Sequence, residues 1–179
     1  MTTWVLLAGP PATGKSALAT ALERRLKAVT LSKDRIRSVL FPGSMTDYTA
    51  EQDDLSMRAM LEAAAYMTAR DRVDFILFDG RTFSRAQQIG EVIVAAERAG
   101  AAWKILQLSC ADEVVAERLS RDDPNHPARN RDMALYRKVK QDFEPILQPK
   151  LELDTTDGIE GKLDEVQDYL KHSAEMGER

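Results

Sequence analysis

The sequence predicts a three-layer α/β sandwich around a parallel β-sheet. Two observations favour this fold class. Short apolar runs such as VLLA and FILF alternate with longer amphipathic stretches along the chain, and nearly continuous apolar runs are typical of parallel strands covered by helices on both faces. Strands that alternate with helices over this length imply right-handed crossovers within one sheet. Because no repeat or Ser/Gly-rich linker divides the 179 residues, we expect a single domain over residues 1–179.

Five segments have the apolar character and the length of strands. In an open α/β sheet, ligands bind beyond the carboxyl ends of the strands, so functional residues are expected just after these segments. The expected strands are Trp4–Ala8, Ala28–Leu31, Phe75–Phe78, Trp103–Leu108 and Lys150–Leu153.

Helices are expected between the strands, where apolar residues recur at helical spacing, as at Leu18, Leu22 and Leu26. Two pairs have the spacing of a capping box, in which a hydroxyl and an amide three residues later satisfy the first backbone N–H groups. The chain also has a glycine where a helix before the fourth strand should end. These signals are Thr49 with Gln52, Ser84 with Gln87, and Gly100.

Composition limits the classes of partner and compartment. The formal net charge is −4, which disfavours nucleic-acid binding because a nucleic-acid interface normally needs a basic face. The single cysteine, Cys110, has no partner for an internal disulfide, which suggests a reducing compartment. The first residues lack a basic leader, and no apolar run approaches the length of a membrane span. We therefore expect a cytoplasmic protein with no membrane partner; the oligomeric state is left open.

Residues 9–16 read G-P-P-A-T-G-K-S and match the pattern G-x-x-x-x-G-K-[ST] between an expected strand and an expected helix. In that context backbone N–H groups and a helix N-terminus can surround a phosphate, so we interpret the stretch as a P-loop rather than a chance turn. Lys15 would reach the β and γ phosphates of ATP, and Ser16 would ligate Mg²⁺. The expected nucleotide-binding residues are Gly9, Pro10, Pro11, Ala12, Thr13, Gly14, Lys15, Ser16 and Ala17.

The segment after the second expected strand, LSKDRIR, places Asp34 and Arg37 on one face of a starting helix. Asp34 could take the proton of an acceptor hydroxyl, and Arg37 could hold the acceptor or the γ phosphate. The alternative is that Asp34 only caps the helix and Arg37 is solvated.

The third expected strand ends in Asp79-Gly80. An acidic residue in this position can order Mg²⁺ or its waters, although Asp-Gly is also a common turn signal. Arg81 and Arg85 follow at helical-turn spacing and could meet an anionic acceptor; for Arg85, the alternative is simple solvation.

A polar, proline-containing stretch between two helical patterns suggests a lid over residues 118–131. Arginines on such a lid can close over a nucleotide and neutralise developing charge, whereas the alternative is a charged helix end. These arginines are Arg118, Arg121, Arg129 and Arg131. Residues 154–158, DTTDG, either border the nucleotide base or form a turn.

Taken together, GPPATGKS, LSKDRIR, FILFDG, ERLSRDD and LYRKVKQDFEPI…LELDTT resemble the small P-loop kinases of the polynucleotide-kinase and zeta-toxin-like group. The resemblance implies a P-loop NTPase kinase-like fold with strand order 2-3-1-4-5. It also implies Asp34 as general base, Arg37 as a ligand of acceptor or phosphate, and Arg118 and Arg121 as lid arginines.

The resemblance implies an ATP- and Mg²⁺-dependent transfer of phosphate to a hydroxyl group. We expect the acceptor to be a small molecule such as a metabolite, sugar or antibiotic. The alternatives are a polynucleotide 5′-hydroxyl, which the acidic charge disfavours, and a regulatory P-loop NTPase without an acceptor site. The chain departs from the group at Ala12, where glycine is usual, and at Ala17, where a second Ser or Thr is usual.

Overall fold

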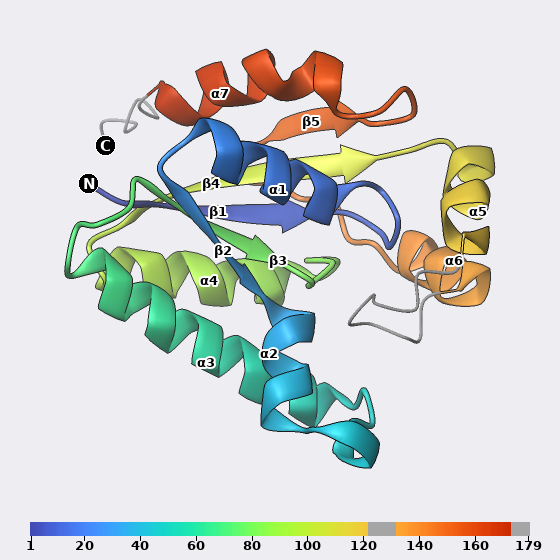
Figure 1. Ribbon diagram of the computed structural model, residues 1–179, viewed down its shortest axis with the longest axis horizontal. Helices are drawn as coiled ribbons and strands as arrows, with labels where there is room; N and C mark the ends of the chain where they lie inside the picture. Colours follow the sequence, from blue (N-terminus) through green and yellow to red (C-terminus); the bar gives the residue numbers. More distant parts are fainter. Residues whose placement is uncertain (122–131, 173–179) are drawn as a thin grey trace.

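A computed structural model describes residues 1–121 and 132–172, and its centre is a five-stranded parallel sheet (Figure 1). The strand order is β2-β3-β1-β4-β5, which confirms the three-layer α/β class and the expected order. Each end of all five strands lies within one residue of the position expected from sequence. They are β1 (Thr3–Ala8), β2 (Ala28–Ser32), β3 (Phe75–Asp79), β4 (Ala102–Ser109) and β5 (Leu151–Asp154).

Side chains of β1 alternate between the two faces of the sheet, and each face is closed by helices. On one face, Val5 and Leu7 pack in a cluster with residues of α1 (Lys15–Arg25) and α7 (Leu163–Lys171). On the other, Trp4 and Leu6 pack with residues of α3 (Ala50–Thr68) and α4 (Ala86–Arg98). Because both faces are covered, β1 is apolar from Trp4 to Ala8, as its sequence predicted.

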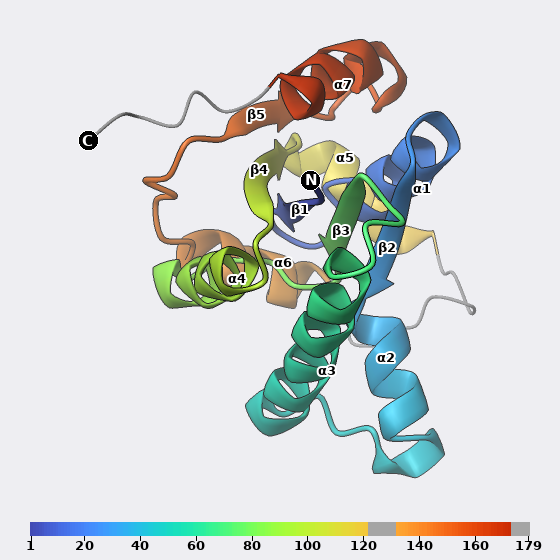
Figure 2. The same ribbon diagram turned by 90° about the vertical axis from the view of Figure 1, so that its left-hand side faces the viewer.

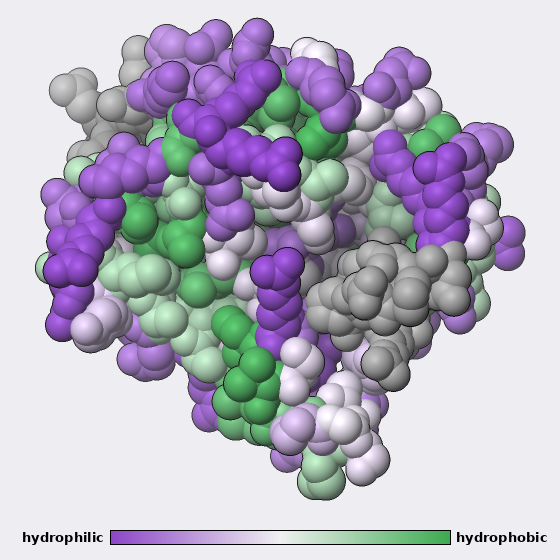
Figure 3. All heavy atoms as spheres, viewed as in Figure 1, coloured by the Kyte–Doolittle hydropathy of each residue, from purple (hydrophilic) through white to green (hydrophobic). Residues whose placement is uncertain are grey.

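The remaining elements lie at the carboxyl ends of the strands or project beyond the sheet. α5 (Asp112–Ser120) and α6 (Met133–Gln141) lie near the strand tips in Figure 1. α2 (Lys33–Leu40) and the short helix η1 (Gly43–Met45) form a projection beside α3 (Figure 2). Figure 3 shows an apolar patch over α2, where Val39 and Leu40 are exposed. A second short helix, η2 (Glu160–Lys162), precedes α7.

The predicted helix boundaries are partly correct. Thr49 is the N-cap of α3, where its hydroxyl accepts a hydrogen bond from the Gln52 backbone N–H at 3.4 Å. Gly100 follows α4 with a φ of +69°, as expected for a glycine that ends a helix.

The capping box expected at Ser84 and Gln87 is wrong. Arg85 occupies the N-cap of α4 and makes no side-chain cap bond. Instead, the Glu144 carboxylate accepts a hydrogen bond from the Ala86 N–H at 2.7 Å. A carboxylate from a distant part of the chain thus satisfies a donor that a local hydroxyl was expected to satisfy.

Most of the predicted lid, including Arg129 and Arg131, lies outside the described residues. Of residues 118–131, the structure describes only Arg118 to Arg121, at the end of α5. Within residues 1–121 and 132–172, no helix combines the length and apolarity needed to cross a bilayer.

The turn after β1 has an unusual backbone. Gly9 has a φ of +138°, and a Cβ there would lie 2.3 Å from the backbone oxygen of Leu108, so only glycine fits against β4. Ala12 has a φ of +61°, in the left-handed region that L-residues other than glycine rarely adopt. The alanine that departs from the resembled group therefore occupies a conformation that glycine would adopt without steric strain.

We predict that Ala12→Gly raises the free energy of unfolding by about 0.5–1 kcal/mol, because it removes the left-handed strain of a Cβ. The matched control is Ala17→Gly, in the first turn of α1, which should lower the free energy of unfolding by up to about 1 kcal/mol. Urea denaturation of both variants measures the two effects. A loss of stability in Ala12→Gly would contradict the strained conformation.

Candidate active site

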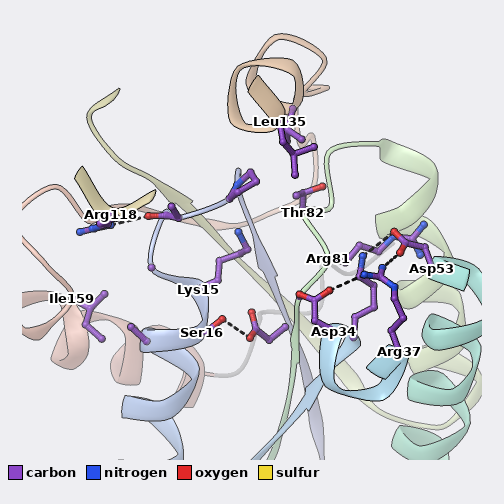
Figure 4. A pocket seen from close by; sticks show the side chains of 18 of the residues that line it. Lys15, Ser16, Asp34, Arg37, Asp53, Arg81, Thr82, Arg118, Leu135 and Ile159 are labelled. Carbon is purple, nitrogen blue, oxygen red and sulfur yellow. Dashed lines mark hydrogen bonds and ion pairs between the residues drawn. The ribbon is translucent and has the colours of Figure 1, made fainter. Parts of the chain in front are cut away.

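A pocket of about 620 Å³ lies at the carboxyl ends of the strands. Its wall comes from the P-loop, α2, the loop after β3, α5, α6 and the η2 region. In Figure 4, Lys15 and Ser16 lie between two groups of side chains. Arg118 and Ile159 lie to one side, and Asp34, Arg37, Asp53 and Arg81 lie to the other. We name the two groups after the roles expected from the sequence: the first is the nucleotide end, and the second, with Lys33, is the acceptor end.

The side chain of Lys15 is hydrogen-bonded to the backbone of its own P-loop. Lys15 is buried, and its Nζ donates hydrogen bonds to the backbone oxygens of Gly9 at 2.8 Å and Pro10 at 2.6 Å. Gly14 is the N-cap of α1, so the first backbone N–H groups of that helix face the same loop. The arrangement is a cradle of donors for an anion, as the motif predicts.

Ser16, at the start of α1, is hydrogen-bonded to Asp79, at the end of β3. The Ser16 hydroxyl donates to Asp79 Oδ2 at 2.7 Å, whereas Asp79 Oδ1 is buried without a hydrogen-bond partner. No group of three His, Cys, Asp or Glu side chains suited to a metal exists among the described residues. A hydroxyl and one carboxylate fit Mg²⁺, because Mg²⁺ usually binds one or two protein oxygens together with substrate phosphates and waters.

Arg118 fastens the P-loop to the loop after β5. Its guanidinium donates to the Ala12 oxygen at 3.1 Å and to the Thr155 oxygen at 2.7 Å. The buried Thr155 hydroxyl in turn donates to the Thr13 oxygen at 2.8 Å. The sequence analysis singled out Arg118, but it included Thr155 only as part of the DTTDG stretch, because a threonine in a turn carries no distinctive signal.

The loop after β5 also closes the nucleotide end. Gly158, Ile159 and Glu160 line the pocket there. Of the DTTDG stretch, only Gly158 reaches the pocket wall, and the next two residues extend it.

Asp34 lies inside α2 and is not its cap. The N-cap position belongs to Ser32, and Asp34 is the second helical residue. A Cβ at Gly80 would lie 3.2 Å from Asp34 Oδ2 and 3.1 Å from the Lys33 backbone nitrogen. The close approach of β3 to the start of α2 therefore requires the glycine that follows Asp79.

Arg37 is buried, and three groups surround its guanidinium. Nη1 contacts Asp34 Oδ1 at 3.2 Å, Nη2 pairs with Asp53, and the guanidinium lies 5.2 Å from the ring centroid of Tyr48. The expected alternative, a solvated Arg37, is therefore wrong. Such a buried guanidinium holds the Asp34 carboxylate in one orientation.

Lys33 is the second buried cation at the acceptor end. Its Nζ donates to Asp53 Oδ2 at 2.8 Å, so Asp53 is shared between Lys33 and Arg37. Burial lowers the pKa of Lys33 to about 8, and the charges of Arg37 and Arg81 act in the same direction. Asp34 and Asp54 oppose the shift.

Arg81 and Arg85 have different surroundings. Arg81 is buried, lines the pocket and has one ion pair, with Asp54 at 3.6 Å. Burial lowers its pKa. Arg85 is half exposed and pairs with Glu144 at 3.1 Å, outside the pocket wall. Of the two arginines after β3, the structure brings only Arg81 to the site.

Four of the predicted site residues do not line the pocket: Arg121, and Gly9, Pro10 and Thr13 of the P-loop. Arg121 is exposed and pairs with Glu117 on its own helix.

Several pocket residues carry no clear signal in the sequence. Asp53 lies in the first turn of α3, where an acidic residue is common for its effect on the helix dipole. The others are ordinary polar or apolar residues of helices and loops. They are Tyr48, Thr82, Gln88, Leu135 and Val139.

Three solved structures are similar to this chain in fold. A protein from Chloroflexus aurantiacus described as a kinase has a TM-score of 0.75 and 22% identity, over 95% of this chain and 99% of that one. The APS kinase of Mycobacterium tuberculosis, in complex with AMPPNP and APS, has a TM-score of 0.68 and 17% identity, with coverages of 96% and 98%. A gluconokinase from Sinorhizobium meliloti has a TM-score of 0.65 and 13% identity, with coverages of 94% and 91%.

At these identities the likeness concerns the fold, and it confirms that the chain has the fold of small P-loop kinases. No curated protein matches the chain. A family model described as an AAA domain matches residues 5–146, from β1 to the segment after α6, and includes the P-loop, Arg118 and the acceptor end but not residues 158–160. The chain therefore belongs to this AAA domain family.

Proposed function

We propose that this protein transfers the γ phosphate of ATP to a hydroxyl group of a small molecule. The observation that carries the proposal is that one pocket contains both the P-loop and, across from it, a carboxylate oriented by a buried arginine. A regulatory NTPase needs the first feature but not the second. Two of the structural neighbours, the APS kinase and the gluconokinase, are named for small acceptors.

The nucleotide end would bind ATP mainly through backbone N–H groups of the P-loop and the start of α1. Lys15 would exchange its bonds to the Gly9 and Pro10 oxygens for bonds to the β and γ phosphates. Arg118 would border the nucleotide from α5. Ser16 and Asp79 would hold Mg²⁺, which neutralises charge on the phosphate oxygens when it is bound.

At the acceptor end, Asp34 would accept the proton of the attacking hydroxyl while Arg37 fixes the carboxylate. Phosphoryl transfer depends mostly on positioning and charge neutralisation, so the rigid pairing of Arg37 with Asp34 and Asp53 suits this role. The role expected for Arg121, neutralising charge during transfer, stays a prediction.

We predict that Lys15→Ala raises the dissociation constant for ATP by at least about 10-fold, because it removes a charge-assisted hydrogen bond to phosphate. The matched control is Lys27→Ala, whose lysine is exposed and should leave the constant unchanged. Calorimetric titration with AMPPNP measures both. Equal affinity in wild type and Lys15→Ala would exclude P-loop binding of the nucleotide.

We predict that Asp79→Asn raises the Mg²⁺ concentration needed for half-maximal AMPPNP binding by about 10–100-fold, since it removes a carboxylate charge from the proposed metal site. Asp74→Asn, at an exposed carboxylate near the other end of β3, serves as the control. Fluorescence titration of a labelled nucleotide at stepped Mg²⁺ concentrations gives the values. An unchanged Mg²⁺ dependence would remove Asp79 from the metal site.

We predict that Asp34→Asn slows phosphoryl transfer by about 10²–10⁴-fold and leaves AMPPNP affinity within a few-fold of wild type. Asparagine keeps the size of the side chain and an oxygen for Arg37, but it cannot take up the proton. The acceptor is first identified by mass spectrometry, as the hydroxylated compound that gains one phosphoryl group, and single-turnover kinetics then compare the variants. Asp71→Asn, at an exposed carboxylate, is the control. Near-wild-type transfer by Asp34→Asn would show that another group is the base.

A further inference from the structure

Arg81 is a buried cation whose bonding is incomplete. It is 9% exposed, lines the pocket, and its Nε has no hydrogen-bond partner. Its ion pair with Asp54 is long, at 3.6 Å, and the Asp54 side chain is 64% exposed. A solvated carboxylate at that distance compensates a buried guanidinium only weakly. The side chain therefore retains capacity to bind an anion from the pocket.

The charges near Arg81 also leave it incompletely compensated. The acceptor end buries the cations Lys33, Arg37 and Arg81. The largely buried carboxylates that pair with cations there are Asp34 and Asp53. Arg37 contacts both carboxylates and Lys33 contacts one of them. The carboxylates that act on Arg81 are instead Glu91 and Asp54, and both are exposed. Because burying an uncompensated charge is costly, a ligand anion at this position would be favourable.

The wall next to Arg81 is suited to a small organic ligand. Gln88 lines the same pocket, where its Oε1 is buried without a hydrogen-bond partner, and Thr82 offers a hydroxyl. Leu135 and Val139, one turn apart on α6, supply an apolar side to the pocket. In Figure 4, Thr82 and Leu135 lie on the same side of the cavity as Arg81, away from Arg118 and Ile159.

We propose that the phosphoryl acceptor carries an anionic group, a carboxylate, phosphate or sulfate, that binds Arg81 while its hydroxyl lies at Asp34. This inference rests on the proposed kinase function and narrows its substrate to hydroxylated anions. Lys33 lies on the same side and adds a second positive charge near the anion. A neutral sugar or antibiotic would leave the charge of Arg81 unmatched.

The transferring phosphate of ATP is the other anion that Arg81 could bind, so the test keeps the P-loop filled. Sodium sulfate is titrated by calorimetry into wild-type protein saturated with AMPPNP and Mg²⁺, at constant ionic strength. The expected result is one saturable sulfate site, whose dissociation constant rises by about 10-fold or more in Arg81→Gln. Arg81→Lys, which keeps the charge but loses the planar fork, should fall between the two.

The matched control is Arg85→Gln, the same change at the half-exposed arginine outside the pocket, which should bind sulfate as the wild type does. Retained AMPPNP affinity in each variant shows that it is folded. Absence of saturable sulfate binding to the wild-type complex, or equal sulfate affinity in wild type and Arg81→Gln, would overturn the anionic acceptor. Failure of the wild type to bind AMPPNP would instead overturn the proposed function, so the two failures are distinguishable.

Discussion

The position of β3 between β1 and β2 is the constraint on which the site depends. Parallel pairing aligns the carboxyl ends of the three strands, with Leu6 opposite Phe78 and Ser32 opposite Asp79. The P-loop after β1 and the start of α2 after β2 therefore flank the end of β3 at the same level. The hydrogen bond from Ser16 to Asp79 joins residues 63 apart in the chain as a consequence of this pairing.

The acceptor end concentrates charges that would be costly to bury singly. Lys33, Arg37 and Asp53 form a connected group in which each charge has a partner, and Asp34 is attached to it through Arg37. Replacing buried ion pairs by apolar residues is often neutral or stabilising, so stability alone does not account for such a cluster. The cluster holds the Asp34 carboxylate in one orientation beside the P-loop. This arrangement is better explained by a role in positioning a reacting group than by a contribution to stability.

The strained backbone of the P-loop and the hydrogen bonds that hold it also favour a fixed arrangement of binding groups. Ala12 keeps a left-handed backbone because neighbouring groups hold it there, including the bond from Arg118 to its carbonyl oxygen. The bond from Thr155 to the Thr13 oxygen ties the loop to the segment after β5. A loop held from two sides presents its N–H groups in a nearly fixed arrangement, so little ordering is needed when an anion binds.

The sequence by itself determined the architecture and the nucleotide end. Apolar runs of strand length located all five strands to within one residue at each end, because both faces of a parallel sheet are buried and their pattern is local. The motif from Gly9 to Ser16 located the P-loop for the same reason, since its chemistry lies in consecutive residues. The positions of Asp34, Arg37 and Asp79 followed from the rule that ligands bind at strand ends.

Only the tertiary structure decided which charges meet at the acceptor end. Nothing in the sequence around Asp53 links it to Lys33 and Arg37, because α3 approaches α2 through packing that no local pattern records. Arg81 and Arg85 look equivalent in the sequence, yet one is buried in the pocket and the other pairs with Glu144 on the surface. Glu144 also accepts the hydrogen bond from the Ala86 N–H at the start of α4, where the sequence predicted a capping box at Ser84. Contacts between distant segments depend on how the helices pack on the sheet, and spacing along the chain does not determine them.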